Sequence, residues 1–235
     1  MNRLSVNDVP PEGVETPMHE LTIAGERVML MTERALYLPA HDALLVADLH
    51  WGKAAAFRAA HIPVPTGTTA ADLARLSRIL TRTNARTLIV LGDLLHAKAG
   101  RQPGTLATIA AWRAEHSSLQ IRLVRGNHDE RAGDPPTELD IACVDAPLMI
   151  GPFACAHHPI PCDAGYVLAG HLHPHVSLGG RGSSTVRLPC FVFGDCVGIL
   201  PAFAEFTGTG AYVVSPSDAL YAIADDAVVP VRVGR

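Results

Sequence analysis

The sequence predicts an α/β fold, because strand-like apolar runs alternate with helical segments along the first half of the chain. Segments 72–83 and 105–115 place their apolar residues at helical spacing. The intervening runs are short, continuous and apolar, as in strands that are covered on both faces: 43–47, 87–91 and 121–124. This alternation favours a parallel sheet over the first half.

The flanking parts of the chain predict a different arrangement of strands. Segments 21–32 and 35–39 alternate like a β-hairpin ahead of the first buried strand. From Leu139 onward, Gly and Pro turns separate short strands with no convincing helix between them, around Ile141, Phe153, Val167, Val186, Phe191, Tyr212 and Ala222. We therefore expect one domain over residues 19–235, mostly β in its second half, after a disordered tail at residues 1–18.

The composition is that of a globular chain, since 48% of its 235 residues are hydrophobic and 18% are charged. No apolar run reaches the roughly 20 residues of a membrane span, and the N-terminus lacks the apolar segment of a signal peptide. The five cysteines form an odd set without a CxxC pair, which fits neither a disulfide framework nor a cysteine zinc site. We expect a cytoplasmic protein with reduced thiols and no membrane partner. The net charge of -4 argues against general coating of nucleic acid, so any such contact must be local.

Polar side chains that can bind metal fall where the predicted strands end. Three such motifs follow the buried strands: Asp48-Leu49-His50, Gly92-Asp93 and Gly126-Asn127-His128-Asp129. Two more follow later apolar runs: His157-His158 and Gly170-His171-Leu172-His173. In open α/β sheets, ligands bind beyond the carboxyl ends of the strands, so this repeated placement indicates a site rather than packing.

The residue types in these motifs indicate a centre of two metal ions. Asp48 and His50 are two positions apart, so their side chains leave the same face if the strand geometry persists, and the same holds for His171 and His173. Carboxylate, amide and imidazole ligands without thiolate suit Mn²⁺, Fe or Zn²⁺ better than Ca²⁺ or an iron-sulfur cluster. A carboxylate can bridge two ions about 3.5–4 Å apart, and Asp93 is placed to do so.

The motifs DxH, GD, GNHD, H and GHxH, in this order from Asp48 to His173, resemble the calcineurin-like metallophosphoesterase superfamily. The surrounding phrases DLHWGKAAAFR, GDLLHAKAGR, RGNHD, FACAHHP and AGHLHP are similar, more narrowly, to the bacterial ligase-associated DNA damage response endonucleases. The resemblance implies a sandwich of two central mixed β-sheets flanked by helices. The active site is then expected at the carboxyl ends of the strands.

Carried over to the matching positions, the resemblance implies two metal sites that share Asp93. The first ion would be held by Asp48, His50 and His173, and the second by Asn127, His157 and His171. Mn²⁺ is the expected metal, with Fe or Zn²⁺ as alternatives. Hydroxide activated by the two ions would attack phosphorus in line, while the ions neutralise charge on the phosphoryl oxygens.

Other polar residues beside the motifs are candidates for catalysis and substrate binding. His128 is not a ligand in the family pattern, and it could protonate the leaving alkoxide, with Asp129 as its orienting partner. Contacts with substrate could come from Lys53, Arg58, Arg125 and His158, although cations in loops are most often only solvated.

The remaining basic residues are interpreted as ordinary surface or packing residues. Arg75, Arg78 and Arg82 recur opposite the leucine face of the predicted helix, where a solvated face is favoured over contact with a DNA backbone. Five histidines lack placement at a strand end, although two of them, His96 and His175, lie close to the motifs: His41, His61, His96, His116 and His175.

The narrower resemblance favours a Mn²⁺-dependent phosphodiesterase that acts as a DNA endonuclease in DNA repair. It implies DNA as a partner, beside a DNA ligase and a helicase of the same repair system, and a homodimer. A hydrolase of small phosphodiesters or nucleotide-sugar pyrophosphates is the enzymatic alternative, because one metal centre can serve many substrates. A non-catalytic protein-binding scaffold is the alternative of another class, and the intact ligand set counts against it.

Overall fold

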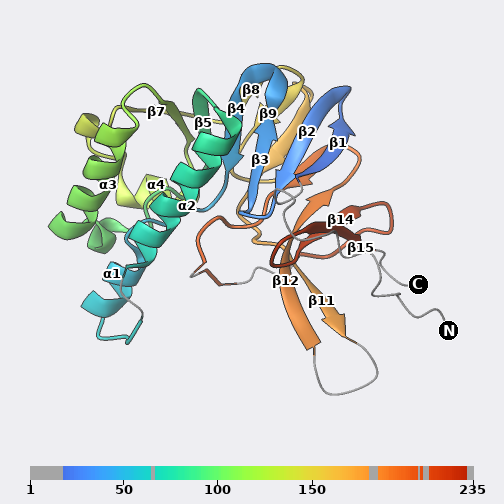
Figure 1. Ribbon diagram of the computed structural model, residues 1–235. Coiled ribbons are helices and arrows are strands. Elements are labelled where there is room, and N and C mark those ends of the chain that lie inside the picture. The colour runs from blue at the N-terminus through green and yellow to red at the C-terminus, as the bar shows by residue number, and fades with distance from the viewer. Residues whose placement is uncertain (1–17, 65–66, 180–184, 206, 209–211, 232–235) are drawn as a thin grey trace.

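The computed structural model describes residues 18–64, 67–179, 185–205, 207–208 and 212–231. Its strands form two mixed β-sheets, and its four α-helices gather on one side of them (Figure 1). This confirms the predicted sandwich. The expected tail at residues 1–18 lies outside the described residues, apart from the exposed Met18.

The first sheet has seven strands in the order of the sequence. They are β1 (His19–Ile23), β2 (Glu26–Met31), β3 (Ala35–Leu38), β4 (Ala43–Val46), β5 (Thr87–Leu91), β6 (Gln120–Val124) and β7 (Ile141–Val144). Strands β4 to β7 are parallel, as the alternation with helices predicts. Strands β1 to β4 are antiparallel, because short turns join them and leave no room for a crossover.

The second sheet has eight strands and contains the later part of the chain. They are β8 (Leu148–Ile150), β9 (Phe153–Cys155), β10 (Tyr166–Ala169), β11 (His175–Gly179), β12 (Thr185–Phe193), β13 (Val197–Ile199), β14 (Ala219–Ile223) and β15 (Val228–Val231). The pairs β9–β10 and β10–β13 are parallel, and the other pairs are antiparallel. No α-helix lies in the described part of this half, in agreement with the predicted run of strands. The strand predicted around Tyr212 is wrong, because Tyr212 lies in a loop ahead of β14.

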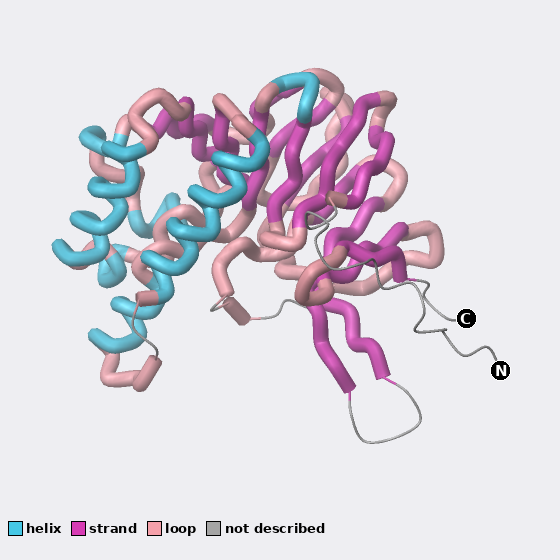
Figure 2. The backbone as a smooth tube through the Cα atoms, viewed as in Figure 1, coloured by secondary structure: helices cyan, strands magenta, loops and turns pink. Residues whose placement is uncertain are grey.

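The helices pack against the first sheet (Figure 2). They are α1 (Lys53–Ala59), α2 (Thr68–Thr83), α3 (Pro103–Glu115) and α4 (Asn127–Ala132), and three 3-10 turns are added at Pro39–His41, Lys98–Gly100 and Thr137–Leu139. Helices α2 and α3 begin slightly before the predicted segments. Helices α1 and α4 were not predicted, because they are too short to show an apolar period and α4 consists largely of the polar GNHD motif.

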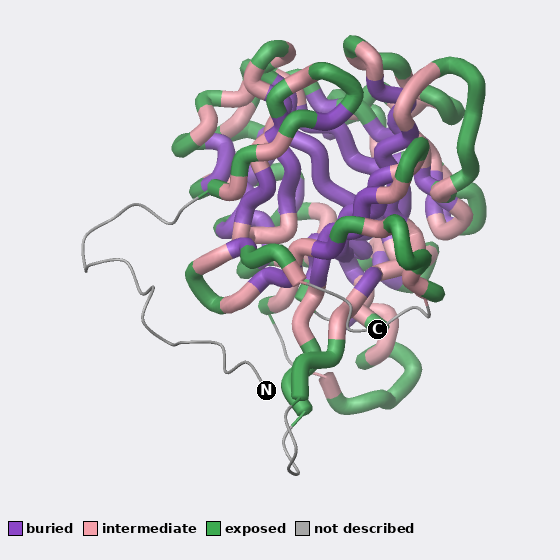
Figure 3. The backbone as a smooth tube through the Cα atoms, turned by 90° about the vertical axis from the view of Figure 1, so that its right-hand side faces the viewer, coloured by how far each residue is buried: buried purple, intermediate pink, exposed green. Residues whose placement is uncertain are grey.

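Two apolar cores hold these layers together, and the buried strands run through the middle of the molecule (Figure 3). Between the sheets, Leu45 and Leu91 of the first pack with Phe153 and Phe191 of the second. On the other face of the first sheet, the leucines of α2 and the side chains of α3 cover the strands. Each such buried side chain contributes about 1.5–3 kcal/mol relative to an exposed one, so the strands of the first sheet are fixed from both faces.

Strand register brings the predicted motifs to one edge. Val46 pairs with Val90, and Leu91 pairs with Val124, so β4, β5 and β6 end at nearly the same level. In the second sheet Leu168 pairs with Cys155, so β9 and β10 end together as well. The two edges are joined because Phe203 donates its amide to the Ala47 carbonyl (2.7 Å).

Two further predictions from composition concern the cysteines and the apolar segments. All five cysteines lie in the described part of the chain, and all five are free thiols. Burial raises the pKa of Cys155 to about 12, which keeps this thiol protonated. Among the described residues, no helix combines the length and the apolarity needed to cross a bilayer.

The prediction that Arg75, Arg78 and Arg82 lie on a solvated face of α2 is wrong for Arg75. Arg75 is buried, because α2 packs beside the segment that follows Phe203. Its guanidinium lies 4.3 Å from the centre of the Phe203 ring, donates to Asp72 Oδ1 and Glu205 Oε1 (both 2.8 Å), and also donates to the Phe203 carbonyl. Arg78 is exposed, and Arg82 pairs with a glutamate of the β2–β3 turn. Arg75 therefore anchors the chain beside the site and is not part of an exposed cationic surface.

Replacing Arg75 should destabilise the fold far more than replacing its exposed neighbour. Burial raises the pKa of Asp72 to about 6 although Arg75 lies beside it, so Arg75→Ala leaves a buried carboxyl without its cation. The free energy of unfolding should fall by about 3–5 kcal/mol, measured by urea denaturation. Arg78→Ala, on the same helix, should change it by no more than about 0.5 kcal/mol. Equal effects of the two substitutions would contradict the anchoring role of Arg75.

Candidate metal centre

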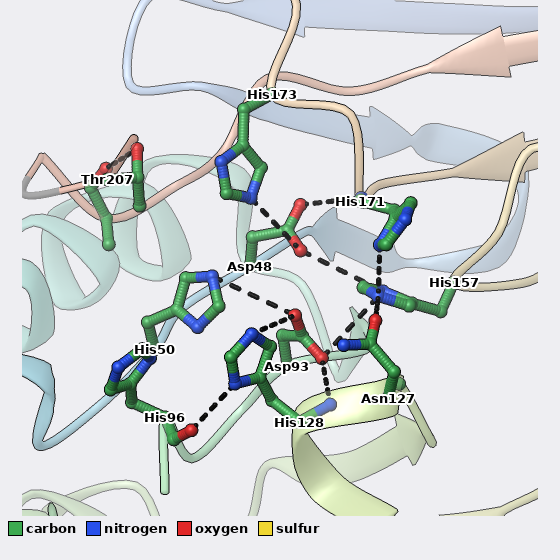
Figure 4. Close-up of polar contacts among 12 residues, drawn as sticks. Asp48, His50, Asp93, His96, Asn127, His128, His157, His171, His173 and Thr207 are labelled. Atoms are coloured by element: carbon green, nitrogen blue, oxygen red, sulfur yellow. Dashed lines mark hydrogen bonds and ion pairs between the residues drawn. The ribbon is translucent and has the colours of Figure 1, made fainter. Parts of the chain in front are cut away.

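The seven predicted ligands meet at the common edge of the two sheets (Figure 4). The first sheet contributes Asp48 and His50 after β4, Asp93 after β5 and Asn127 at the start of α4. The second sheet contributes His157 after β9, and His171 and His173 after β10. Ligand atoms of Asp48, His50 and His173 lie within 4.8 Å of one another, as do those of Asp48, Asp93 and His157.

The ligands converge because of left-handed backbone at the strand ends. Asp48, His50, Asp93, His171 and His173 have φ values of 55°, 44°, 54°, 71° and 43°. The condition under which Asp48 and His50 would share a strand face, persistence of the strand geometry, is not met, since β4 ends at Val46. The same is true for His171 and His173, since β10 ends at Ala169. Each residue in this conformation costs on the order of 1–3 kcal/mol and persists only where its surroundings enforce it. Such a concentration of left-handed residues is typical of a functional site.

Two motif glycines leave space for the ligands. A Cβ on Gly92, whose φ is +77°, would come within 2.2 Å of His157 Nδ1. A Cβ on Gly126 would come within 2.4 Å of Asp93 Oδ1. The GD and GNHD motifs therefore require glycine, because at each glycine the backbone closely approaches a predicted ligand from a different motif: His157 at Gly92 and Asp93 at Gly126.

Asp48 shows that the centre needs a cation. The residue is fully buried, and its Oδ2 accepts the His171 amide (2.9 Å). Its Oδ1 has no hydrogen-bond partner among the described residues, although His173 Nε2 lies 3.5 Å away. A buried carboxylate oxygen without a donor is costly. A divalent ion between Asp48 and His173 would supply the missing positive charge.

Lone pairs also converge at the second predicted site. His157 Nδ1 donates to the Leu91 carbonyl (3.0 Å), so the Nε2 of the neutral ring carries a lone pair. Asn127 Oδ1, which can only accept, lies 3.0 Å from this Nε2, and His171 Nδ1 also lies 3.0 Å from it. Burial lowers the pKa of His157. This disfavours the protonated ring, whose second N–H could otherwise donate a hydrogen bond to Asn127 Oδ1. These donors fit a metal ion held by Asn127, His157 and His171.

Asp93 lies between the two sets of ligands. Its Oδ1 is 3.5 Å from His157 Nε2, and its Oδ2 is 3.9 Å from His50 Nε2. Its Oδ1 also accepts the backbone amide of His128 (2.9 Å). Burial raises the pKa of Asp93, and the charge of Asp48 adds to this, so the hydrogen bond from the His128 amide compensates the ionised form only in part. Its two oxygens face different ligand sets, as a bridging carboxylate requires.

Comparison with known proteins identifies the family. The family model for calcineurin-like phosphoesterases matches residues 42–161. The chain belongs to this family. The crystal structure of the Pseudomonas putida nuclease MPE is 44% identical and has a TM-score of 0.81, covering 92% of this chain and 100% of that chain. Yfce, a phosphoesterase from E. coli, is 14% identical with a TM-score of 0.39, covering 78% of this chain and 88% of that chain. No curated protein matches the chain.

The chain is thus a metallophosphoesterase of a family that uses divalent metal ions, and its aspartate and histidine clusters could bind them. His50 fits this chemistry as a neutral imidazole. Burial, followed by the nearby charge of Lys53, lowers its pKa to about 2. Its ring is therefore ready to bind a metal without first losing a proton.

In this calcineurin-like phosphoesterase, His128 is oriented differently from the prediction. Its Nδ1 donates to the main-chain carbonyl of His96 (2.8 Å), and its Nε2 lies 3.9 Å from Asp93 Oδ2. Asp129, the expected orienting partner, instead accepts the backbone amides of Asp93 (2.7 Å), Leu94 (3.0 Å) and Gly126 (3.0 Å). Asp129 therefore ties the GD loop to the start of α4, because backbone amides surround its carboxylate.

The predicted substrate contacts lie in different surroundings. Lys53 is half-buried, and burial lowers its pKa although Asp48 and Asp93 act in the opposite direction. Arg58 lines a pocket between α1 and the starts of α2 and α3. His158 is exposed, with its ring 4.3 Å from that of His171. Arg125 forms ion pairs at 2.8 Å with Asp134 and Asp145, so binding a phosphate there would compete with two carboxylates.

The sequence places His96 among the surface or packing residues, although close to the motifs, and assigns it no role. In the structure its ring lies 5.3 Å from that of His50 and 5.0 Å from that of His128. Its place in the phrase GDLLHAKAG, directly after a ligand motif, was the available signal. His175, the other histidine close to the motifs, donates from Nδ1 to the His173 carbonyl (2.7 Å).

Removing one ligand imidazole should weaken one metal site and leave the other intact. In His157→Ala, we expect one of two bound Mn²⁺ ions to be lost or to bind more than about 100-fold more weakly, since even outer-shell changes cost 10–100-fold. Metal content after dialysis and titration calorimetry would measure this. His41→Ala is the matched control, because His41 pairs with Glu26 (2.8 Å) on the hairpin and should retain both ions. Two ions bound to His157→Ala with unchanged affinity would contradict the predicted ligand set.

Proposed function

We propose that this metallophosphoesterase is a Mn²⁺-dependent phosphodiesterase that cuts DNA as an endonuclease. The observation that carries the proposal is the similarity to the P. putida nuclease MPE, at 44% identity over 92% of this chain and the whole of that one. The complete ligand set, four members of which are buried, supports catalysis and counts against a protein-binding scaffold. The mixture of carboxylate, amide and imidazole donors is compatible with Mn²⁺.

The contacts at the centre support the proposed ligand roles. Asp48, His50 and His173 would hold one ion, Asn127, His157 and His171 would hold the other, and Asp93 would be shared between the two sets. When bound, the two ions supply an activated water and neutralise charge on the phosphoryl oxygens. His157 and His173 are fixed for this task, because each donates from Nδ1 to a main-chain carbonyl, of Leu91 (3.0 Å) and Gly208 (2.8 Å) respectively. Their Nε2 atoms therefore face the centre.

His128 is the proposed general acid. The His96 carbonyl holds the proton on its Nδ1, so only Nε2 can exchange a proton with the leaving oxygen of the substrate. The side chain is 31% exposed, whereas Asp93 beside it is 4% exposed. His128 is thus open to a bound phosphodiester in a way that the buried ligands are not. It would donate its Nε2 proton as the phosphorus–oxygen bond breaks.

The biological role is proposed from the resemblance to the ligase-associated DNA damage response endonucleases. We infer a role in DNA repair, with a DNA ligase and a helicase as partners and a homodimer as the assembly. Lys53, at the start of α1 and within electrostatic range of Asp48 and Asp93, is the best placed of the proposed substrate contacts. A cytoplasmic location stays a prediction.

Activity on several substrates would test the proposed function. Purified protein with Mn²⁺ should nick supercoiled plasmid DNA and cleave single-stranded or duplex DNA internally, and Asp93→Ala should be inactive. A chromogenic phosphodiester and a phosphomonoester, assayed in parallel, separate the alternatives. Cleavage of small diesters without nicking of DNA would reject the endonuclease in favour of a small-molecule hydrolase. Absence of all hydrolysis would favour a scaffold.

His128→Ala should bind metal normally yet turn over slowly. Loss of a general acid costs about 10²–10⁴ in rate, and the cost should be largest for substrates whose leaving group is a poorly stabilised alkoxide. Single-turnover rates on DNA, with metal content measured on the same sample, would show this. Full activity of His128→Ala on DNA would refute its role as an acid.

A further inference from the structure

Two buried ring nitrogens beside the metal centre have no partner. His50 Nδ1 and His96 Nδ1 are both buried and make no hydrogen bond to any described residue. A histidine that binds metal through one nitrogen normally donates the other N–H to a fixed acceptor. His157 and His173 do so, to the carbonyls of Leu91 and Gly208. His50 lacks such an acceptor in this arrangement.

His96 is positioned to supply it. One ring nitrogen from each of His50, His96 and His128 lies within 4.8 Å of the other two, and the rings of His50 and His96 meet edge to face with an interplanar angle of 78°. A small rotation of one ring or a single water molecule spans such a gap. The two unpartnered nitrogens, one on each ring, would satisfy one another: His50 as donor and His96 as acceptor.

The other side of His96 contacts the proposed general acid. The rings of His96 and His128 stack with centroids 5.0 Å apart and an interplanar angle of 24°. Phe57 of α1 stacks on His96 at 5.9 Å and 27°. The main-chain carbonyl of the same residue accepts the His128 Nδ1 proton. One residue therefore limits both the rotation and the tautomer of His128.

We propose that His96 is a positioning residue that links metal-binding His50 to the acid His128. Its ring nitrogen accepts the His50 Nδ1 proton, and its ring face holds His128 in place. The inference rests on the roles proposed above for these two histidines. A third metal site in the same cluster is disfavoured, because the nearly parallel rings of His96 and His128 direct their in-plane lone pairs side by side rather than toward one ion.

Two substitutions separate the two parts of the proposal. His96→Phe keeps an aromatic ring to stack on His128 but removes the acceptor for His50. His96→Ala removes both the ring and the acceptor. The main-chain carbonyl remains in each variant, so only the side chain is tested. His116→Ala is the matched control, since His116 is also half-buried and packs on a ring, that of Trp112 at 4.8 Å, away from the centre.

The first measurement is Mn²⁺ binding to metal-free protein, which needs no activity. Titration followed by the electron paramagnetic resonance of free Mn²⁺ should show one site weakened about 10–100-fold in both His96→Phe and His96→Ala. His116→Ala should bind like the unmodified chain. Unchanged affinity in His96→Phe would overturn the acceptor role, provided that its thermal unfolding midpoint shows a folded protein. If His96→Phe does not fold, His96→Gln takes its place. The amide oxygen of the glutamine can accept the His50 Nδ1 proton, so this variant should recover the Mn²⁺ affinity that His96→Ala loses.

The second measurement compares leaving groups at saturating Mn²⁺. In His96→Ala, kcat for an alkyl phosphodiester should fall on the order of 10²-fold, as a misplaced catalytic group does, whereas kcat for a p-nitrophenyl diester should change little. His96→Phe should retain the ratio of the unmodified chain. An unaltered ratio in His96→Ala would overturn the positioning of His128. No hydrolysis by the unmodified chain would instead reject the proposed function, and Mn²⁺ binding would still decide the link to His50.

Discussion

A cluster of buried hydrogen-bond acceptors without matching donors is the constraint on which the rest of the structure depends. Asp48 Oδ1 has no partner among the described residues, and Asn127 Oδ1 lies 3.0 Å from an imidazole nitrogen that also carries a lone pair. In a low-dielectric interior such a set repels itself, and bound cations would remove the penalty. Metal binding would therefore be linked to folding, because the ions would stabilise an arrangement that the chain alone leaves uncompensated.

Both sheets are needed to hold these acceptors in place. The first sheet presents the two aspartates, His50 and Asn127, and the second presents the other three histidines. The carboxylate of Asp48 accepts the amide of His171, and the Ala47 carbonyl accepts the amide of Phe203, so the edges are bonded to each other directly. The apolar core between the sheets then fixes the separation of the two ligand sets. This explains why the set of seven proposed ligands comes from residues spread over most of the chain.

Much of this could be predicted from the sequence, because residue type and strand-end placement carry chemical information. The buried strands, α2, α3 and the convergence of the motifs followed from apolar periodicity and from the rule for ligands at strand ends. The left-handed backbone at Asp48 and His50 could not be predicted, since the tertiary contacts that enforce it are invisible in a local pattern. Arg75 was placed on the wrong surface for the same reason: helical spacing identifies the leucine face, but the position of Phe203 decides which flank is covered. The contacts of Asp129 and His96 depend on loops that meet only in the folded chain.

Substrate selectivity must then come from residues outside the set of proposed metal ligands. Four of the seven proposed ligands, Asp48, His50, Asp93 and His157, are buried, and the Nδ1 atoms of His157 and His173 already donate to main-chain carbonyls. The ligands therefore have little capacity left to distinguish one phosphodiester from another. Of the candidates at the rim, Arg125 is already paired with two carboxylates, whereas His158 is exposed beside His171 and Lys53 lies within range of the two aspartates. A few side chains around the metal centre can be substituted while the proposed metal ligands stay the same. This separation is the physical reason that one phosphoesterase fold can serve many substrates.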